Sequence, residues 1–204
     1  SISNIPQSAR KLRHLRKLQI NGNRLIEIPE WVKNLSRLIE LKLSGNGLTE
    51  IPKWIGDLNH LKFLDLSNNS LTEIPGSLEN LKQLTEFNIS NNFLTKLPDW
   101  IGNLFQLTKL SLNRNRFTQI PESIGNLSNL GKLNLNRNNL TEIPASIGNL
   151  YCLTSLTLLG NNLADIPESV GNLKKLTELN VSENCLAELP ASLSDKFELG
   201  MQYN

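Results

Sequence analysis

Hydrophobic residues recur in this chain with a period of 23 residues, unbroken by insertion or deletion, from Leu15 to Leu176. Counting that leucine as repeat position 0, apolar side chains also occupy positions 3, 5, 10, 13, 17 and 20. The stretch Leu133-Asn134-Leu135 alternates apolar and polar residues, which predicts a short strand with one buried face. One repeat cannot close a core alone, so we expect the repeats to stack as a solenoid with one continuous core.

Two polar or helix-starting residues recur as strictly as the leucines. Position 8 is always asparagine and position 14 always proline, as in Asn115 and Pro121. A buried amide without partners would cost roughly 1–3 kcal/mol, so we expect each asparagine to bond the backbone of its own turn and of the next coil. Proline can start a short helical or 3₁₀ segment. A glycine at position 18, such as Gly125, is expected to permit the turn that ends this segment.

The resulting unit, LxxLxLxxNxLxxIPxxIGNLxx, resembles the 23-residue class of leucine-rich repeats. That class is common in bacterial leucine-rich proteins, in Roco-type GTPases and in intracellular Ras-associated repeat proteins. The resemblance implies an α/β solenoid, a right-handed superhelix with a concave parallel β-sheet and short convex helical or 3₁₀ segments. We expect eight full repeats over residues 15–198, a half repeat acting as a cap over residues 1–14, and a degenerate C-terminal end over residues 199–204.

The resemblance also implies a non-catalytic scaffold that binds a partner protein or peptide on its concave face. Two alternatives stay open: the sensing segment of a larger multidomain enzyme such as a Roco-type GTPase, and a bacterial effector that binds a host protein. The sequence shows no catalytic motif that would indicate an enzyme. The only histidines, His14 and His60, have no carboxylate or nucleophile placed to form a triad, and no phosphate-binding loop, HExxH or CxxC motif occurs. We expect no cofactor and no metal.

Charge and cysteine content limit the expected partners and cellular location of the chain. The formal net charge is only +2, and no apolar run approaches the ~20 residues of a membrane span, so neither nucleic acid nor membrane is an expected partner. Cys152 and Cys185 are placed too far apart for a disulfide. The chain shows neither the cysteine-rich end caps of secreted animal relatives nor a signal peptide, which favours the cytoplasm or a secreted bacterial effector. A monomer is favoured.

Function has to reside in positions that the template leaves free, which on the concave sheet are positions 2, 4, 6, 7 and 9. Strands about 4.8 Å apart would bring Lys109, Lys132, Arg114 and Arg137 together as a basic cluster in the middle of that face, with Arg116 at its edge. Such a cluster suits an acidic peptide or a phosphate group, although a merely solvated surface is the alternative. The predicted contact surface consists of Phe63, Glu86, Lys109, Arg114, Lys132 and Arg137.

Three tryptophans mark the convex side. Trp31, Trp54 and Trp100 share position 16, where most other repeats carry serine. They are expected either to cover the convex turns or, because interaction surfaces are enriched in tryptophan, to form a second contact site. On the concave side, three apolar residues at free positions are candidate anchors for a peptide: Phe63, Phe93 and Leu159.

Overall fold

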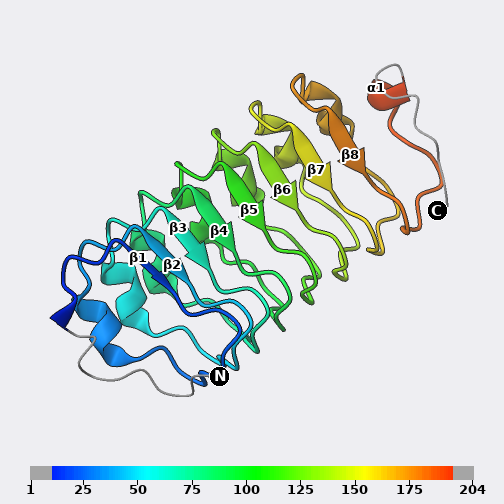
Figure 1. Ribbon diagram of the computed structural model, residues 1–204. Helices are drawn as coiled ribbons and strands as arrows, with labels where there is room; N and C mark the ends of the chain where they lie inside the picture. Colours follow the sequence, from blue (N-terminus) through cyan, green and yellow to red (C-terminus); the bar gives the residue numbers. More distant parts are fainter. Residues whose placement is uncertain (1–10, 195–204) are drawn as a thin grey trace.

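The sheet of the predicted solenoid is present in the computed structural model, which describes residues 11–194 (Figure 1). In that part of the chain, eight three-residue strands form one parallel sheet in sequence order, one strand from each repeat. The strands are β1 (Lys17–Gln19), β2 (Glu40–Lys42), β3 (Phe63–Asp65), β4 (Glu86–Asn88), β5 (Lys109–Ser111), β6 (Lys132–Asn134), β7 (Ser155–Thr157) and β8 (Glu178–Asn180).

On the other side of each coil the chain forms a five-residue 3₁₀ segment directly after the repeat's proline. The segments are η2 (Glu30–Asn34), η3 (Lys53–Asp57), η4 (Gly76–Asn80), η5 (Asp99–Asn103), η6 (Glu122–Asn126), η7 (Ala145–Asn149) and η8 (Glu168–Asn172), followed in the last described repeat by the short helix α1 (Ala191–Ser194). Pro121, for example, has φ −69° and accepts a hydrogen bond from Ile124 N at 3.0 Å. The predicted role of proline in starting the segment is confirmed.

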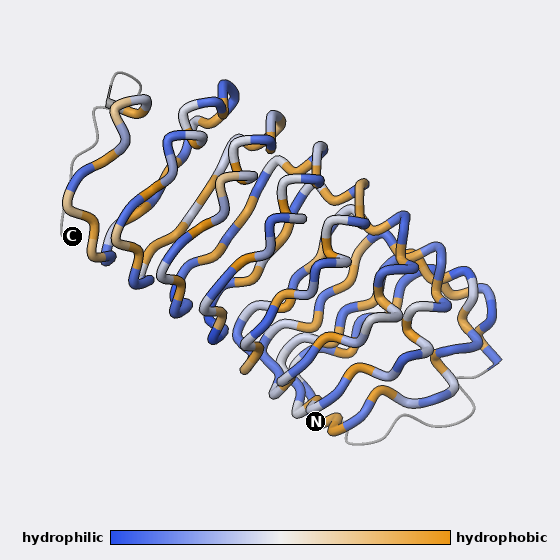
Figure 2. Tube along the Cα trace, turned by 180° about the vertical axis from the view of Figure 1, so that it is seen from behind, coloured by the Kyte–Doolittle hydropathy of each residue, from blue (hydrophilic) through white to orange (hydrophobic). Residues whose placement is uncertain are grey.

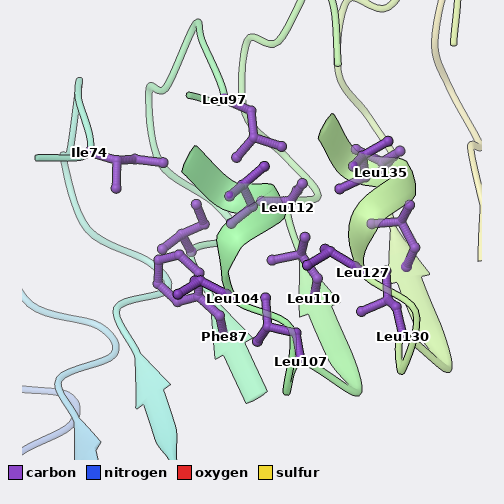
Figure 3. Packing of buried hydrophobic residues seen from close by; sticks show 14 of the residues in the cluster. Ile74, Phe87, Leu97, Leu104, Leu107, Leu110, Leu112, Leu127, Leu130 and Leu135 are labelled. Carbon is purple, nitrogen blue, oxygen red and sulfur yellow. The ribbon is translucent and has the colours of Figure 1, made fainter. Parts of the chain in front are cut away.

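The core contains the apolar positions that the repeat predicted. In the fifth repeat, all seven predicted side chains, from Leu107 to Leu127, are buried. Figure 2 shows the apolar residues recurring coil after coil, and Figure 3 shows side chains of neighbouring coils, such as Leu107 and Leu130, packed in one continuous cluster. At the N-terminal end Leu15 and Leu18 are only partly buried. The solenoid with one shared core is thus confirmed.

Buried asparagine amides connect each coil to its neighbour. In Asn92, Nδ2 donates to Ile89 O of its own turn and to Leu66 O of the preceding coil, both at 3.1 Å, while Oδ1 accepts from Leu71 N at 3.0 Å. The same three bonds recur throughout a set that we call the asparagine ladder: Asn46, Asn69, Asn92, Asn115, Asn138, Asn161 and Asn184. The prediction of a structural role is confirmed, but the coil that each amide reaches is the preceding one rather than the next.

The position-18 glycines serve a different purpose from the one predicted. Gly125 and Gly148 are not among the residues with positive φ, so no turn conformation requires glycine there. Instead, the neighbouring coil leaves no space: a Cβ at Gly148 would lie 2.5 Å from Ser169 O and 2.6 Å from Ser169 Cβ. Glycine is therefore needed for close packing between successive 3₁₀ segments.

This glycine is paired with the residue that faces it in the next coil. Every repeat with glycine at position 18 is followed by a repeat with serine at position 16, as in Gly56 and Ser77. The two described repeats with a long side chain there, Lys33 and Glu79, are followed by Trp54 and Trp100. At those two junctions, η2 to η3 and η4 to η5, the 3₁₀ segments make far fewer contacts than at the glycine–serine junctions. The spacing of the convex segments therefore varies along the solenoid, whereas the strands pair in constant register.

Several sequence predictions fall wholly or partly beyond the described residues. The C-terminal end assigned to residues 199–204 and most of the half repeat assigned to residues 1–14 lie there. Within the described part, no helix is long and apolar enough to cross a membrane.

Removing one amide of the asparagine ladder should be costly. The substitution Asn161→Ala leaves Leu140 N–H and two buried carbonyls without this partner, so we expect a loss of about 3 kcal/mol in unfolding free energy. The neighbouring Asn162→Ala is the matched control, because that side chain is exposed. Urea denaturation followed by circular dichroism measures both; equal midpoints for the two variants would contradict the structural role of the ladder.

Adding a methyl group at a glycine–serine junction should also destabilise the protein. Gly148→Ala places Cβ against backbone and side-chain atoms of Ser169, and we expect a cost of about 1–3 kcal/mol from overpacking. Gly76→Ala is the control, since no atom lies within 4 Å of its added Cβ, and it should be neutral or gain up to about 1 kcal/mol. The two midpoints of thermal unfolding should move in opposite directions or differ clearly; similar shifts would refute the packing explanation.

Candidate functional site

Four of the six predicted contact residues form a row across the sheet. Phe63, Glu86, Lys109 and Lys132 start strands β3 to β6 and are direct partners in the strand register. The three charged residues are exposed and Phe63 is half-buried. The repeat period places them in line because residues 23 positions apart are strand neighbours. The structure thus brings these four residues together on one surface.

Arg114 and Arg137, the other two predicted residues, follow β5 and β6 in equivalent turns, exposed to solvent. Their backbone is left-handed, with φ 57° and 54°. The sequence prediction treated position 7 as unconstrained, and this is wrong: all eight repeats have positive φ there, with glycine in three and asparagine in two. The recurrence of glycine and asparagine at one position was the signal that could have revealed the turn.

Arginine is an unfavourable residue for this turn. A left-handed conformation brings Cβ close to the following carbonyl oxygen and costs roughly 1–2 kcal/mol for most residues, whereas glycine has no Cβ and asparagine adopts it more readily. Two adjacent repeats nevertheless carry Arg114 and Arg137 there. Glu183 shares the conformation in the last described repeat, so the fold tolerates a charged residue at this position. The local backbone gives no reason for two cations side by side.

A shallow hollow of about 220 Å³ lies next to the basic cluster on the concave face. Three predicted residues, Phe63, Glu86 and Lys109, line it. Its remaining lining comprises Lys42, Leu64, Asp65, Phe87, Asn88 and Ser111. The polar members of that set all occupy position 4 of their repeats. The repeat template leaves this position free, but no contact residue was predicted there, because the sequence alone does not show which free positions line the same hollow.

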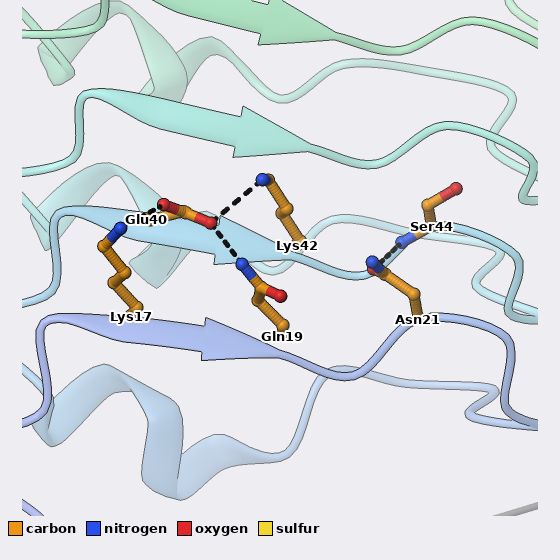
Figure 4. A network of polar contacts seen from close by, with 6 residues as sticks. All are labelled: Lys17, Gln19, Asn21, Glu40, Lys42 and Ser44. Atoms are coloured by element: carbon orange, nitrogen blue, oxygen red, sulfur yellow. Dashed lines mark hydrogen bonds and ion pairs between the residues drawn. The ribbon is translucent and has the colours of Figure 1, made fainter.

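The cations of the basic cluster differ from the lysines at the N-terminal end of the sheet. Glu40 is buried on the concave face and pairs with Lys42 at 2.9 Å and Lys17 at 3.4 Å, and it accepts a hydrogen bond from Gln19 (Figure 4). The hydrogen bonds from Lys42 and Gln19 lower the pKa of the Glu40 carboxyl, and its pairing with Glu40 raises the pKa of Lys42. Both lysines of this network are thus engaged with the Glu40 carboxylate.

No comparable partner neutralises the basic cluster. Among residues 11–194, the ion pairs involve only Lys17, Lys33 and Lys42 with Glu30 and Glu40. Lys109 and Lys132 are strand neighbours of the same charge, a pairing that is destabilising in the absence of an anion. The cluster is therefore a patch of exposed positive charge in which none of the four cations forms an ion pair, although Glu86 lies next to Lys109 in the strand register.

A cation–aromatic contact borders the cluster. The Arg116 guanidinium lies 4.7 Å from the centroid of the Phe93 ring, one repeat away, and Phe93 is 43% exposed. Such stacking orders both side chains. The two residues that the sequence identified separately, as a further arginine and as an apolar anchor, thus form one feature.

The tryptophans serve packing. Trp31 is buried, and Trp54 and Trp100 are partly buried against the core. This supports the prediction that they cover the convex turns. Within the described residues, no three His, Cys, Asp or Glu side chains gather in a way that could hold a metal ion.

Comparison with known proteins agrees with this architecture. A family model described as a leucine-rich repeat region matches residues 40–134 and 119–196, and a second leucine-rich repeat model matches residues 14–35. The chain belongs to the leucine-rich repeat family. This fold is commonly a protein–protein interaction scaffold, and the family and its structural neighbours are typically non-enzymatic binding modules. No curated protein matches the chain significantly.

Solved structures similar to this chain include bacterial and plant proteins. A leucine-rich repeat protein of Leptospira interrogans is 35% identical with a TM-score of 0.91, covering 94% of this chain and 49% of that one. An internalin of Listeria monocytogenes is 27% identical with a TM-score of 0.81, covering 92% and 54%. The ectodomain of the Arabidopsis receptor kinase HAESA, in complex with an IDA peptide hormone, is 36% identical with a TM-score of 0.79, covering 89% and 32%. This chain therefore spans about half or less of these structures.

Replacing the two turn arginines should stabilise the protein. Asn68 and Asn91 occupy the same turn in the third and fourth repeats, so Arg114→Asn/Arg137→Asn should fold normally and gain up to about 1 kcal/mol per site. The control is Lys109→Asn/Lys132→Asn, which removes the same amount of positive charge from the same face but changes no residue with a left-handed backbone. If the lysine variant gained as much in urea denaturation, charge repulsion rather than backbone conformation would be the cause.

Proposed function

We propose that this chain is a non-catalytic recognition scaffold that binds a partner protein or peptide through its concave sheet. The contact surface consists of Phe63, Glu86, Lys109, Arg114, Lys132 and Arg137. The observation that carries the proposal is that, among the described residues, none of the four cations of the basic cluster forms an ion pair, and the cluster lies beside an open hollow. Surfaces of this kind are stabilised by a complementary partner.

The same role applies if the repeats are the recognition segment of a larger protein, such as a Roco-type GTPase. It applies equally to a bacterial effector that binds a host protein. HAESA is a receptor kinase whose repeat ectodomain was solved with a peptide hormone, and the fold it shares with this chain supports peptide binding as the general mode. We further propose a cytoplasmic setting or secretion from a bacterium, with the protein acting as a monomer; the free thiols of Cys152 and Cys185 are compatible with a reducing compartment.

Charge reversal on the sheet should abolish partner recovery. Affinity capture from an extract of the source organism is compared between the wild type and Lys109→Glu/Lys132→Glu, and we expect at least about tenfold less partner with the variant, because acids would then face acids. The control is Lys53→Glu/Lys82→Glu, which makes the same change in net charge at exposed positions on and next to the 3₁₀ segments.

Quantitative mass spectrometry of the captured proteins measures both variants against the wild type. Partners lost with the sheet variant and retained with the control support the proposal. Unchanged recovery of every partner with Lys109→Glu/Lys132→Glu would overturn it.

A further inference from the structure

The proposed contact surface defines where a partner binds but not which chemical groups the partner carries there. Resting on that proposed function, we infer that the occupant of the concave face is an extended peptide segment with an apolar side chain and a carboxylate side chain about four residues apart. The apolar side chain sits in the hollow against Phe63, and the carboxylate sits between the lysine row and the arginine turns of the fifth and sixth repeats.

The carboxylate position follows from the charges around the basic cluster. Lys109 and Lys132 lie side by side on β5 and β6, and Arg114 and Arg137 occupy equivalent turns after the same two strands. On this face, Glu86 is the strand partner of Lys109, and Glu183 occupies the equivalent turn two repeats after Arg137; neither forms an ion pair with any of the four cations. They flank the cluster on either side along the solenoid. An incoming anion is therefore attracted to the fifth and sixth repeats and repelled on both sides.

The backbone adds a second, independent observation. Asparagine or glycine would fill the turns after β5 and β6 at lower conformational cost, as they do after β1 to β4 and β7. Residues held in sparsely populated conformations cluster at ligand-binding sites, where the cost is offset by function. Two neighbouring repeats accept this cost with cations beside two lysines, which points to an anionic ligand rather than to the fold.

The hollow supplies the second contact. It lies over β2 to β5, with half-buried Phe63 on its wall, and at about 220 Å³ it has room for one side chain. Leu64 and Phe87 also line it but are almost fully buried, so Phe63 supplies its exposed apolar surface, and the other lining residues are polar: Lys42, Asp65, Glu86, Asn88, Lys109 and Ser111. Lys109 lines the hollow and also belongs to the basic cluster, so the two contacts adjoin. An apolar side chain that covers Phe63 would remove from water the most exposed apolar surface of the hollow.

The separation of the two contacts sets the spacing in the ligand. From Phe63 on β3 to Lys132 on β6 there are three strand steps, each about 4.8 Å, or about 14 Å in all. An extended chain advances about 3.3–3.6 Å per residue. A peptide crossing the strands therefore carries its carboxylate about four residues along the chain from its apolar side chain.

Selection from a displayed library of random 12-residue peptides on the immobilised wild-type chain tests this inference. We expect enriched peptides to carry Asp or Glu about four residues from an aliphatic or aromatic residue. Arg114→Asn/Arg137→Asn should weaken their binding about tenfold or more, measured by fluorescence anisotropy, since two charge-assisted contacts are lost. Phe63→Ser should weaken binding similarly. Serine is chosen because it occurs naturally at the equivalent position of the seventh repeat, as Ser155.

Two further measurements test whether the binding depends on the charges of the concave face. Lys53→Asn/Lys82→Asn, away from the sheet, should leave the affinity unchanged. Raising NaCl from about 0.05 to about 0.5 M should weaken wild-type binding strongly and that of Arg114→Asn/Arg137→Asn much less, because screening acts on exposed charges.

Failure of this inference can be told apart from failure of the proposed function. Enriched peptides without acids that still lose binding with Phe63→Ser would overturn the inference and leave the concave face as the binding surface. Peptides that respond only to Lys53→Asn/Lys82→Asn would overturn both. No enrichment at all would overturn the peptide inference, while affinity capture would still decide the proposed function. A phosphorylated residue preferred about tenfold or more over Asp at the acidic position would overturn the choice of a carboxylate.

Discussion

The asparagine amides that join coil to coil are the contacts on which the remaining structure depends. Each repeat turns sharply after its strand, and the turn leaves backbone N–H and C=O groups that point into the core. An amide such as that of Asn92 satisfies two carbonyls and one N–H at once, and it does so in two successive coils. Because unsatisfied buried polar groups are costly, the leucine side chains can pack tightly only where this bonding is complete.

The fixed spacing that follows from this bonding also determines what the surface can do. Strands in constant register place residues 23 positions apart next to one another. Surface chemistry therefore accumulates in rows, and a charge repeated in two neighbouring repeats becomes a local concentration of charge. The basic cluster arises in this way, and so does the ion-paired network around Glu40, where a lysine and a glutamate are neighbours in the row instead. The order of charges in only two or three neighbouring repeats determines whether the charged side chains of a row pair with one another or remain available to a partner.

Much of the fold and of the candidate site could be predicted from the sequence, because with a strict period a residue's position in the repeat determines its location in the coil. Leu107, Asn115 and Pro121 were assigned correctly to core, turn and start of the 3₁₀ segment, and the row containing Lys109 and Lys132 follows from the same arithmetic. Periodicity does not report backbone dihedral angles, which is why the left-handed turn at Arg114 was missed. It also does not report distances between coils. The role of Gly148 and the depression beside Phe63 both depend on such distances.

The pairing of glycine with serine on the convex side has a consequence for the history and redesign of the repeats. Each junction depends on both of its residues: the repeat with Gly125 at position 18 is followed by one with serine at position 16, whereas the repeat with Glu79 there is followed by one with tryptophan. Excising residues 130–152 would join Gly125 to Ser169 and preserve the rule, but excising residues 84–106 would bring Glu79 against Ser123. Although all repeats share one length, they are not interchangeable modules. Duplication and loss of repeats can proceed freely only within the run that shares the glycine–serine junction.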